Sequence, residues 1–435
     1  MKWTAAIPVA LAVGAVVAAS TVSVPAAHEG SVPVITTVAV EPSNQPAVCP
    51  GPLEVPVGEI SSGDDALDSS SEDRTLWVSP DPSGEVGDGD LVDATVATSM
   101  ERVGGGDIAS LAGTTCTPPR QDQWIVAGST AVGSSARLVL SNPSEATVRV
   151  TVSLFGPVSV DGRESFTTAV GAGAQETVLL ESVEPELPAL AVRVQAGGVG
   201  IATALQDSRL DGFVAAGTDW ATASASGTDL LVPIAGPSST QQPASLRLVA
   251  PEDAQVSLSM WGESGTREWL DGQTLDLEAG LVTDVTVPAG EWGAVRVESD
   301  TPVSAAALTR SGYELGEDAL PAADLAWTPA QAVGNATPRA VVVPEGDVTV
   351  VATAPEGTAL TLTDTAGDVL VDETVHGEYV HAFALSVPAG TVLRSDSHAT
   401  WALHVRDGGF ITTLTPRPVE RVAQEVAIEP GTYVN

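Results

Sequence analysis

The clearest signal in the chain is an alternation of apolar and polar residues. In "NPSEATVRVTVSLFGP", residues 142–157, Val148, Val150, Val152 and Leu154 share one parity, and polar residues hold most of the other positions. A period of two over this length predicts a β-strand that buries one face and exposes the other. No segment shows a convincing period of 3.6 residues, so the pattern favours an all-β protein.

Parts of this pattern return about a hundred residues later. "VTVSLFG" (150–156) matches "VSLSMWG" (256–262) at an offset of 106, and "AVRVQAGGVGIATAL" (191–205) matches "AVRVESDTPVSAAAL" (294–308) at an offset of 103. A looser copy, "ALHVRDGGFITTL", stands at 402–414. We predict that each of these last three segments is a hairpin, because Asp-Gly and Gly-Gly tolerate the positive φ of hairpin turns.

The repeats predict three tandem immunoglobulin-like β-sandwiches, each with seven or eight short strands. A β-propeller is the alternative, but its blades run to about 40–50 residues, so the longer repeat favours sandwiches. The predicted organisation is a signal peptide or membrane anchor at 1–27, a loop-rich acidic N-terminal region with one disulfide at 28–120, β-sandwich repeats at 121–228, 229–325 and 326–418, and a C-terminal tail at 419–435.

The N-terminal segment predicts export. After Lys2, residues 3–27 carry no charge, and Val24-Pro25-Ala26 offers the small residues of a signal-peptidase site. The run is also long enough, at about 20 residues, to remain in a bilayer as a helix. Cleavage and anchoring both stay open, and in either case we expect an extracellular or cell-envelope protein that meets the membrane only through this segment.

The chain contains two cysteines, Cys49 and Cys116. In an oxidising compartment an even pair most simply forms one disulfide. A metal site would need more ligands than two thiols, and no histidine lies near them in the sequence. We therefore predict a Cys49–Cys116 disulfide and no metal.

The charge balance excludes one class of partner. The chain has 56 acidic and 18 basic residues, for a formal net charge of −38. Such a surface repels phosphate backbones and offers no basic patch to anionic lipids. We expect no nucleic-acid partner.

One family resemblance covers most of the exported part. Cys-Pro-Gly-Pro at 49–52, the strand pair "RLVLSNPSEATVRVTVSLFG" at 137–156 and the apolar N-terminus resemble an actinobacterial exported family, domain of unknown function 5719. The likeness extends from about residue 45 to 418. It implies a secreted or membrane-anchored envelope protein, and it brings no catalytic residue to carry over.

The usual catalytic motifs are missing from the sequence. There is no Gly-x-Ser-x-Gly elbow, His-Glu-x-x-His pair, Walker sequence or dinucleotide fingerprint. On continuous strands His376 and His381 would point to opposite faces, and His398 would lie about 20 Å from His404, so we expect surface or edge histidines. Acidic clusters at 64–68 and 88–93 resemble calcium loops but lack the closing glutamate, which favours solvated loops. We expect no enzyme and no cofactor.

Two tryptophans are the candidate binding residues. Strand parity points Trp261 away from the face formed by Val256, Leu258 and Met260, and Trp269 follows in a turn-rich stretch. Exposed aromatics stack on sugars or anchor partner proteins, but the interpretation that we favour is that each covers a seam between modules or a strand end.

The sequence therefore favours an exported, non-catalytic envelope protein that serves as a scaffold or interaction module. Its expected partner is an envelope protein or a cell-wall polymer. One alternative is a carbohydrate- or wall-binding protein that uses exposed aromatics. A second alternative is a hydrolase whose catalytic carboxylates are hidden among the 56 acids.

Overall fold

The computed structural model describes residues 36–40, 47–54, 91–92, 97–158, 165–212, 214–234, 236, 238–315, 320–334, 337–419 and 424–428. Over these ranges the chain is all-β, as predicted, with three single-turn 3-10 helices: η1 (Gly106–Ile108), η2 (Leu180–Ser182) and η3 (Leu270–Gly272). No helix in the described part is long and apolar enough to cross a membrane. The predicted signal peptide or anchor at 1–27 lies outside the described residues.

The chain divides into two compact bodies, residues 1–43 with 421–435, and residues 44–420. In the first body, β1 (Thr36–Val40) pairs antiparallel with β32 (Gln424–Ile428). The segment predicted as a C-terminal tail therefore contributes a strand. Everything below concerns the second body.

Module 1, residues 122–221, consists of two four-stranded sheets that enclose an apolar core. Val150, Val152 and Leu154 project from one sheet, and Leu138 and Leu140 project from the other. One sheet has the order β6 (Asp122–Ile125), β11 (Ala191–Ala196), β8 (Val148–Phe155), β9 (Ser165–Val170). The other has the order β10 (Gln175–Leu179), β7 (Ser134–Ser141), β12 (Ala202–Asp211), β13 (Val214–Ala221).

Module 2, residues 226–332, forms one nine-stranded sheet, and in it 256–262 is a strand with alternating burial, as 150–156 is in module 1. Val256, Leu258 and Met260 are buried in the second core as Val150 and Val152 are in the first. The strands are β14 (Ser226–Pro233), β15 (Ser245–Val249), β16 (Ala254–Gly262), β17 (Gly265–Glu268), β18 (Leu275–Leu277), β19 (Val282–Thr286), β20 (Ala294–Leu315), β21 (Leu320–Pro329) and β22 (Gln331–Ala332).

The predicted hairpins at 191–205 and 294–308 are wrong. Strand β11 pairs with β6 and β8, whereas β12 pairs with β7 and β13, so the turn between them carries the chain from one sheet to the other. In module 2 the same path is one strand, β20, which pairs first with β14 and β16 and then with β15 and β21. Glycines between β11 and β12 would permit a hairpin turn. The two strands do not pair, because their apolar residues enter the same core from two different sheets.

Module 3, residues 339–418, contains a predicted hairpin that does form. β29 pairs with β30 across Gly408 and Gly409. The sequence match aligned this segment with β11 and β12. In the sheets, however, β29 lies between β24 and β30 as β12 lies between β7 and β13, so β29 and β30 correspond to β12 and β13. The strands are β23 (Arg339–Val342), β24 (Asp347–Thr353), β25 (Thr358–Thr363), β26 (Val369–Val375), β27 (Val380–Ala384), β28 (Val392–Ser395), β29 (Thr400–Asp407), β30 (Phe410–Leu414) and β31 (Arg417–Pro418).

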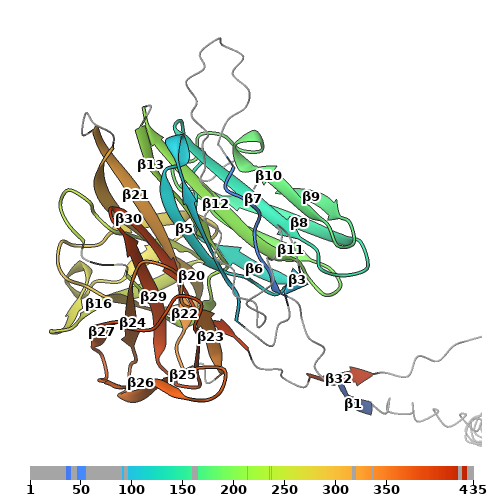
Figure 1. Ribbon diagram of the computed structural model, residues 1–435. Coiled ribbons are helices and arrows are strands. Elements are labelled where there is room, and N and C mark those ends of the chain that lie inside the picture. Colours follow the sequence, from blue (N-terminus) through green and yellow to red (C-terminus); the bar gives the residue numbers. More distant parts are fainter. Residues whose placement is uncertain are drawn as a thin grey trace, which may run out of the picture. The chain divides into compact units, whose positions relative to one another are not determined.

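Four strands from different parts of the chain, β5, β13, β21 and β30, lie together (Figure 1), and their contacts close a ring. Each contacts the next, and β30 contacts β5. Each is the last strand of its sheet, so the sheets make a four-bladed, propeller-like arrangement. The N-terminal contribution is β2 (Ala47–Val48) paired with β3 (Leu91–Val92), and β4 (Ser99–Gly104) paired with β5 (Ser110–Thr115).

A glycine permits one of the closest approaches in this ring. Gly217 of β13 has a φ of 106°, and a Cβ atom there would lie 2.6 Å from the backbone nitrogen of Leu325 in β21. Any other residue would force the two strands apart.

Candidate functional site

Three features of the second body are candidates: a disulfide, a pair of buried carboxylates and a pocket between modules 2 and 3. The predicted Cys49–Cys116 disulfide is confirmed, with Cα atoms 4.4 Å apart. Both cysteines are fully buried against Met100 and Trp220.

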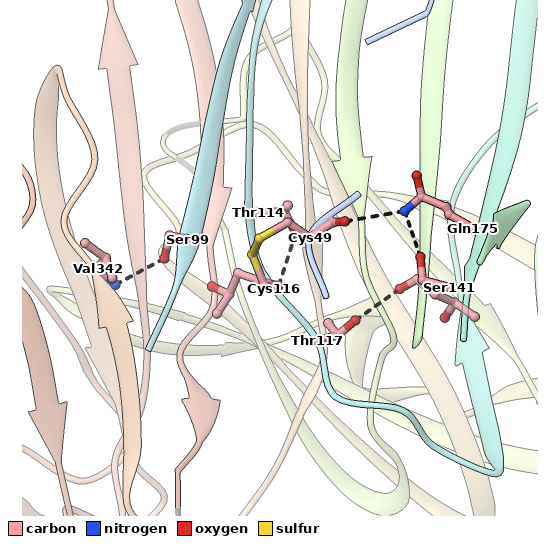
Figure 2. The surroundings of a disulfide bond; sticks show 10 residues. Cys49, Ser99, Thr114, Cys116, Thr117, Ser141, Gln175 and Val342 are labelled. Carbon is pink, nitrogen blue, oxygen red and sulfur yellow. Dashed lines mark hydrogen bonds between the residues drawn. A yellow bond between two sulfur atoms is a disulfide. The ribbon is translucent and has the colours of Figure 1, made fainter. Parts of the chain in front are cut away.

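The disulfide joins the two ends of the N-terminal segment, and hydrogen bonds near it connect this segment to the rest of the body (Figure 2). The Gln175 side chain donates to the carbonyl oxygen of Cys49 at 3.5 Å and to the Ser141 hydroxyl at 2.8 Å. On the other side, the backbone N–H of Val342 donates to the Ser99 hydroxyl at 3.1 Å. The region predicted to be loop-rich thus includes, at 97–116, strands that are buried between modules 1 and 3.

Two fully buried aspartates, Asp219 on β13 and Asp324 on β21, link the ring strands; we call them the axial carboxylates. Asp219 accepts hydrogen bonds from the Trp327 backbone N–H at 2.7 Å and from the Thr412 hydroxyl at 2.9 Å. Asp324 accepts from the backbone N–H groups of Leu111 at 3.1 Å and Ile411 at 2.9 Å. Between them the two side chains connect all four strands.

Burial sets the protonation of the axial carboxylates. It raises the pKa of Asp324 to about 8 and holds the pKa of Asp219 well above its ordinary value. The N–H donors favour the ionised form, but the loss of solvent outweighs them, and Asp324 also raises the pKa of Asp219 by repulsion. Neither side chain reaches solvent. Because their hydrogen bonds join the ring strands, the role that we assign to the pair is structural.

The predicted exposure of Trp261 and Trp269 is wrong. Parity does place Trp261 opposite Val256, Leu258 and Met260, but module 3 covers that face, and only 2% of the residue is exposed. It packs with Val351 and Val380, and its indole N–H donates to the Ser259 hydroxyl. Trp269 is 4% exposed in the module 2 core. Neither side chain offers a surface for stacking a ligand.

A pocket of about 590 Å³ lies where modules 2 and 3 meet; we call it the junction pocket. Module 3 contributes the face of its β24–β27–β29 sheet that is opposite the core, including Thr349, Val351 and His404. Module 2 contributes the ends of β14 and β16 and the segment before β20. Its lining residues from these segments include Ile234, Glu263, Ser264, Glu291 and Trp292.

Two lining side chains of the junction pocket have nitrogens without a hydrogen-bond partner among the described residues. They are His404 Nε2 and Trp292 Nε1. His404 is 7% exposed, which corrects the prediction of a surface or edge histidine. Burial lowers its pKa to about 3, with repulsion from Arg406 as a smaller cause, so the imidazole is neutral at ordinary pH.

A second, smaller hollow of about 270 Å³ adjoins the junction pocket, since both are lined by Glu263, Val380 and Ala382. It also contains His376 and His381, which the sequence analysis placed on opposite faces of one strand. A turn precedes β27, so the strand does not continue between them. His381 Nε2 lies 3.3 Å from Glu373 Oε2.

Among the described residues, no group of three or more His, Cys, Asp or Glu side chains is placed to hold a metal ion. The acidic clusters at 64–68 and 88–93 fall outside those residues, apart from the two-residue strand β3. Sequence reasoning missed Trp292 and His404 as pocket residues. The period-two pattern of 400–407 places His404 opposite Trp401 and Leu403, but no sequence signal identifies the module that covers this face.

The family of unknown function DUF5719 has a model that matches residues 76–388, more than half of the 435 residues. No curated protein matches the chain. A solved structure titled "Biofilm associated protein - BSP domain" is similar at 10% sequence identity, over 86% of this chain and 68% of that chain, with a TM-score of 0.17. A TM-score this low carries no argument about fold or function.

Proposed function

The chain belongs to the family of unknown function DUF5719, and on that premise we propose that it is an exported, non-catalytic cell-envelope protein that serves as a scaffold or protein-interaction module. The observation that carries this proposal is the closed ring of β5, β13, β21 and β30. It joins segments from residue 110 to residue 414 into one body, with a disulfide at its N-terminal end. A body braced in this way suits a protein that must hold its shape outside the cell.

At the level of the modules, we propose tandem β-sandwich repeats. They have the two-layer architecture of immunoglobulin domains but a strand order that differs from that of an immunoglobulin domain. Support comes from the two sheets of module 1 and the alternating burial of β8 and β16. The partner that we propose is an envelope protein or a cell-wall polymer, and the net charge of −38 argues against nucleic acid.

Cell fractionation tests the location. We expect the full chain in the envelope or the medium, and we expect a variant that lacks residues 2–27 to stay in the cytoplasm. Crosslinking of the full chain in intact cells should then capture an envelope component. Recovery of the full chain in the cytoplasm contradicts the proposal.

The hydrolase alternative is best tested at the junction pocket, because Glu263, Glu291 and His404 all line it. General acid–base catalysis works best with a pKa near the working pH, and the pKa of His404 is about 3. This imidazole is therefore a poor proton carrier, which supports the non-catalytic proposal. Release of soluble products from wall polysaccharide that Glu263→Gln or Glu291→Gln abolishes would establish the hydrolase instead.

A further inference from the structure

The junction pocket and the adjoining hollow run over one face of module 3. Val351 on β24, Val380 and Ala382 on β27 and His404 on β29 belong to this face. The face opposite forms the core of module 3 with Val350, Trp401 and Leu403. The packed core on the opposite face holds these strands in place. The pocket-lining face is therefore a rigid surface, which we call the floor of the pocket.

The wall contributed by module 2 holds a tryptophan in a defined position. Trp292 is half-buried, and two glycines leave room for its indole ring. A Cβ atom on Gly262 would lie 3.4 Å from the ring, and one on Gly290 would lie 2.6 Å from Nε1. A larger residue at Gly290 would displace the ring, whereas a Cβ on Gly262 would only touch it. The indole ring of Trp292 thus packs on the backbone of module 2 beside the floor.

The polar groups of the pocket are mixed with apolar ones. Glu263 and Glu291 supply carboxylate oxygens, which accept hydrogen bonds from hydroxyl groups. The ring nitrogens of His404 and Trp292 are closed to solvent, so the polar groups that the pocket presents are those of Glu263, Glu291 and Arg406. Sugars present hydroxyl groups beside apolar C–H faces, which is the same mixture.

The charged side chains of the lining restrict the net charge of a suitable ligand. An anionic ligand would meet Glu263 and Glu291 in a protein of net charge −38. A cationic ligand would meet the guanidinium of Arg406, which lines the same pocket. With His404 neutral, the lining suits an uncharged ligand.

The length of the groove favours more than one sugar ring. The junction pocket, at about 590 Å³, lies within the usual size range of ligand sites. The adjoining hollow of about 270 Å³ extends the pocket past Glu263 to Tyr379. The side chain of Tyr379 is exposed to solvent. Trp292 and Tyr379 thus provide one aromatic ring in each half of the groove.

We propose that the junction pocket and the adjoining hollow together bind a neutral oligosaccharide, with Trp292 and Tyr379 as its stacking surfaces and Glu263 as a hydrogen-bond acceptor between them. The proposal deepens the proposed function, because it names the class of cell-wall polymer that the scaffold would hold. Purified protein tests it without reference to cellular location, so the two proposals can fail separately.

Isothermal titration of the full chain supplies the test. The neutral probes are the tetrasaccharides of glucose, mannose and N-acetylglucosamine, with trigalacturonate as the anionic probe and tetramethylammonium as the cationic one. We expect saturable binding of at least one neutral tetrasaccharide, and none of either charged probe. Saturation by a charged probe alone, or by no probe, overturns the proposal.

Variants locate the binding. Glu263→Gln and Tyr379→Ala alter exposed side chains, so the fold should persist, and each should weaken the neutral ligand roughly tenfold. Trp292→Phe keeps a ring but removes the N–H, and should weaken binding less than Trp292→Ala. Glu278→Gln is the matched control, since Glu278 is exposed in module 2 and absent from the lining. Binding that is unchanged in both Glu263→Gln and Tyr379→Ala contradicts the assigned site.

Discussion

Asp324 is the residue at which three strands of the ring meet. It belongs to β21 and accepts hydrogen bonds from backbone N–H groups of Leu111 in β5 and Ile411 in β30. Isolated burial of a carboxyl group is costly, and the hydrogen bonds offset that cost only while all partners remain in place. The same side chain therefore brings strands together and penalises arrangements in which they separate.

Replacing Asp324 should destabilise the protein more than its size suggests. Asp324→Ala leaves the N–H groups of Leu111 and Ile411 without their acceptor, at about 1–3 kcal/mol for each buried group. We expect a loss of at least about 3 kcal/mol in the free energy of unfolding, measured with urea. Asp324→Asn keeps one acceptor oxygen and should cost less. Asp276→Asn, at an exposed position, is the control and should change the free energy by less than about 0.5 kcal/mol.

The pKa of Asp324 also predicts how stability depends on pH. The folded protein holds this proton up to a pKa of about 8, whereas an unfolded aspartate releases it near pH 3.9. Between these values the folded state binds more protons, so stability falls as the pH rises. His404 acts in the opposite sense between its folded pKa of about 3 and its unfolded value, which lies near 6.5. Above pH 6.5 the contribution of His404 fades, and the decline due to Asp324 and Asp219 should dominate.

We therefore expect a loss of about 2 kcal/mol from Asp324 between pH 6.5 and pH 8, with any contribution from Asp219 in the same direction. Urea unfolding at several pH values measures it. Asp324→Asn has no carboxyl proton at this position and should show a shallower decline. A slope that is identical in Asp324→Asn and the unmutated protein would show that Asp324 titrates at the same pH in both states.

At the scale of single elements, the sequence predicted strands well and their pairing poorly. The alternation of Val148, Val150 and Val152 identifies β8 and its buried face, and the offset of 106 residues identifies β16. These are local properties. Whether two consecutive strands pair, as β29 and β30 do, or enter different sheets, as β11 and β12 do, depends on which core their apolar residues reach.

Trp261 shows the same limit at the candidate site. Its parity was predicted correctly, but exposure depends on a strand more than a hundred residues away, since Val380 of β27 packs on it. Trp292 and His404 were not predicted as a site for the corresponding reason. The pocket exists only where modules 2 and 3 meet, and the sequence of either module alone carries no signal for it.

The segment joined by the Cys49–Cys116 disulfide is the element that should depend most on a covalent bond. Its β2–β3 and β4–β5 pairs form only two-stranded sheets, which are marginal on their own. The bond closes a loop with a sequence separation of 67, for which the chain-entropy model gives about 4 kcal/mol of stabilisation.

We expect Cys49→Ser with Cys116→Ser to lower the free energy of unfolding by about 2–4 kcal/mol. Urea unfolding of the exported protein, with and without a reductant, measures the change. The reductant should reproduce the loss in the unmutated protein and have no effect on the double variant. Equal stability of the two proteins under oxidising conditions would mean that hydrogen bonds such as that from Gln175 to Cys49 suffice.

At the scale of the whole body, the modules share their packing instead of meeting as separate domains. Trp327 of β21 is 1% exposed within the core of module 1, and its indole N–H donates to Asp207 of β12 at 2.8 Å. Arg247 of β15 makes a second link. Its guanidinium, 2% exposed, donates to the carbonyl oxygens of Gly128 at 2.6 Å and Leu190 at 3.1 Å in module 1.

Arg247 has two further contacts that fix its position in this interface. It forms a two-pronged pair with Asp284 at 2.7 and 2.9 Å, and its Cζ atom lies 4.9 Å from the centre of a Trp327 ring. The planar guanidinium satisfies all of these partners at once, which an ammonium group does not. Because its contacts span modules 1 and 2, Arg247 should determine whether the two modules unfold together.

We expect Arg247→Lys and Arg247→Ala to lower the free energy of unfolding, by about 1–2 and about 3 kcal/mol respectively, since the carbonyl oxygens of Gly128 and Leu190 lose their donors. Calorimetry should show one unfolding transition for the unmutated protein. Arg247→Ala should show a broader or divided transition, because it removes the hydrogen bonds that join module 2 to module 1. Arg267→Gln, an exposed substitution in module 2, is the matched control and should keep the single transition. A single, equally sharp transition in Arg247→Ala would mean that the ring strands alone, through Asp219 and Asp324, couple the modules.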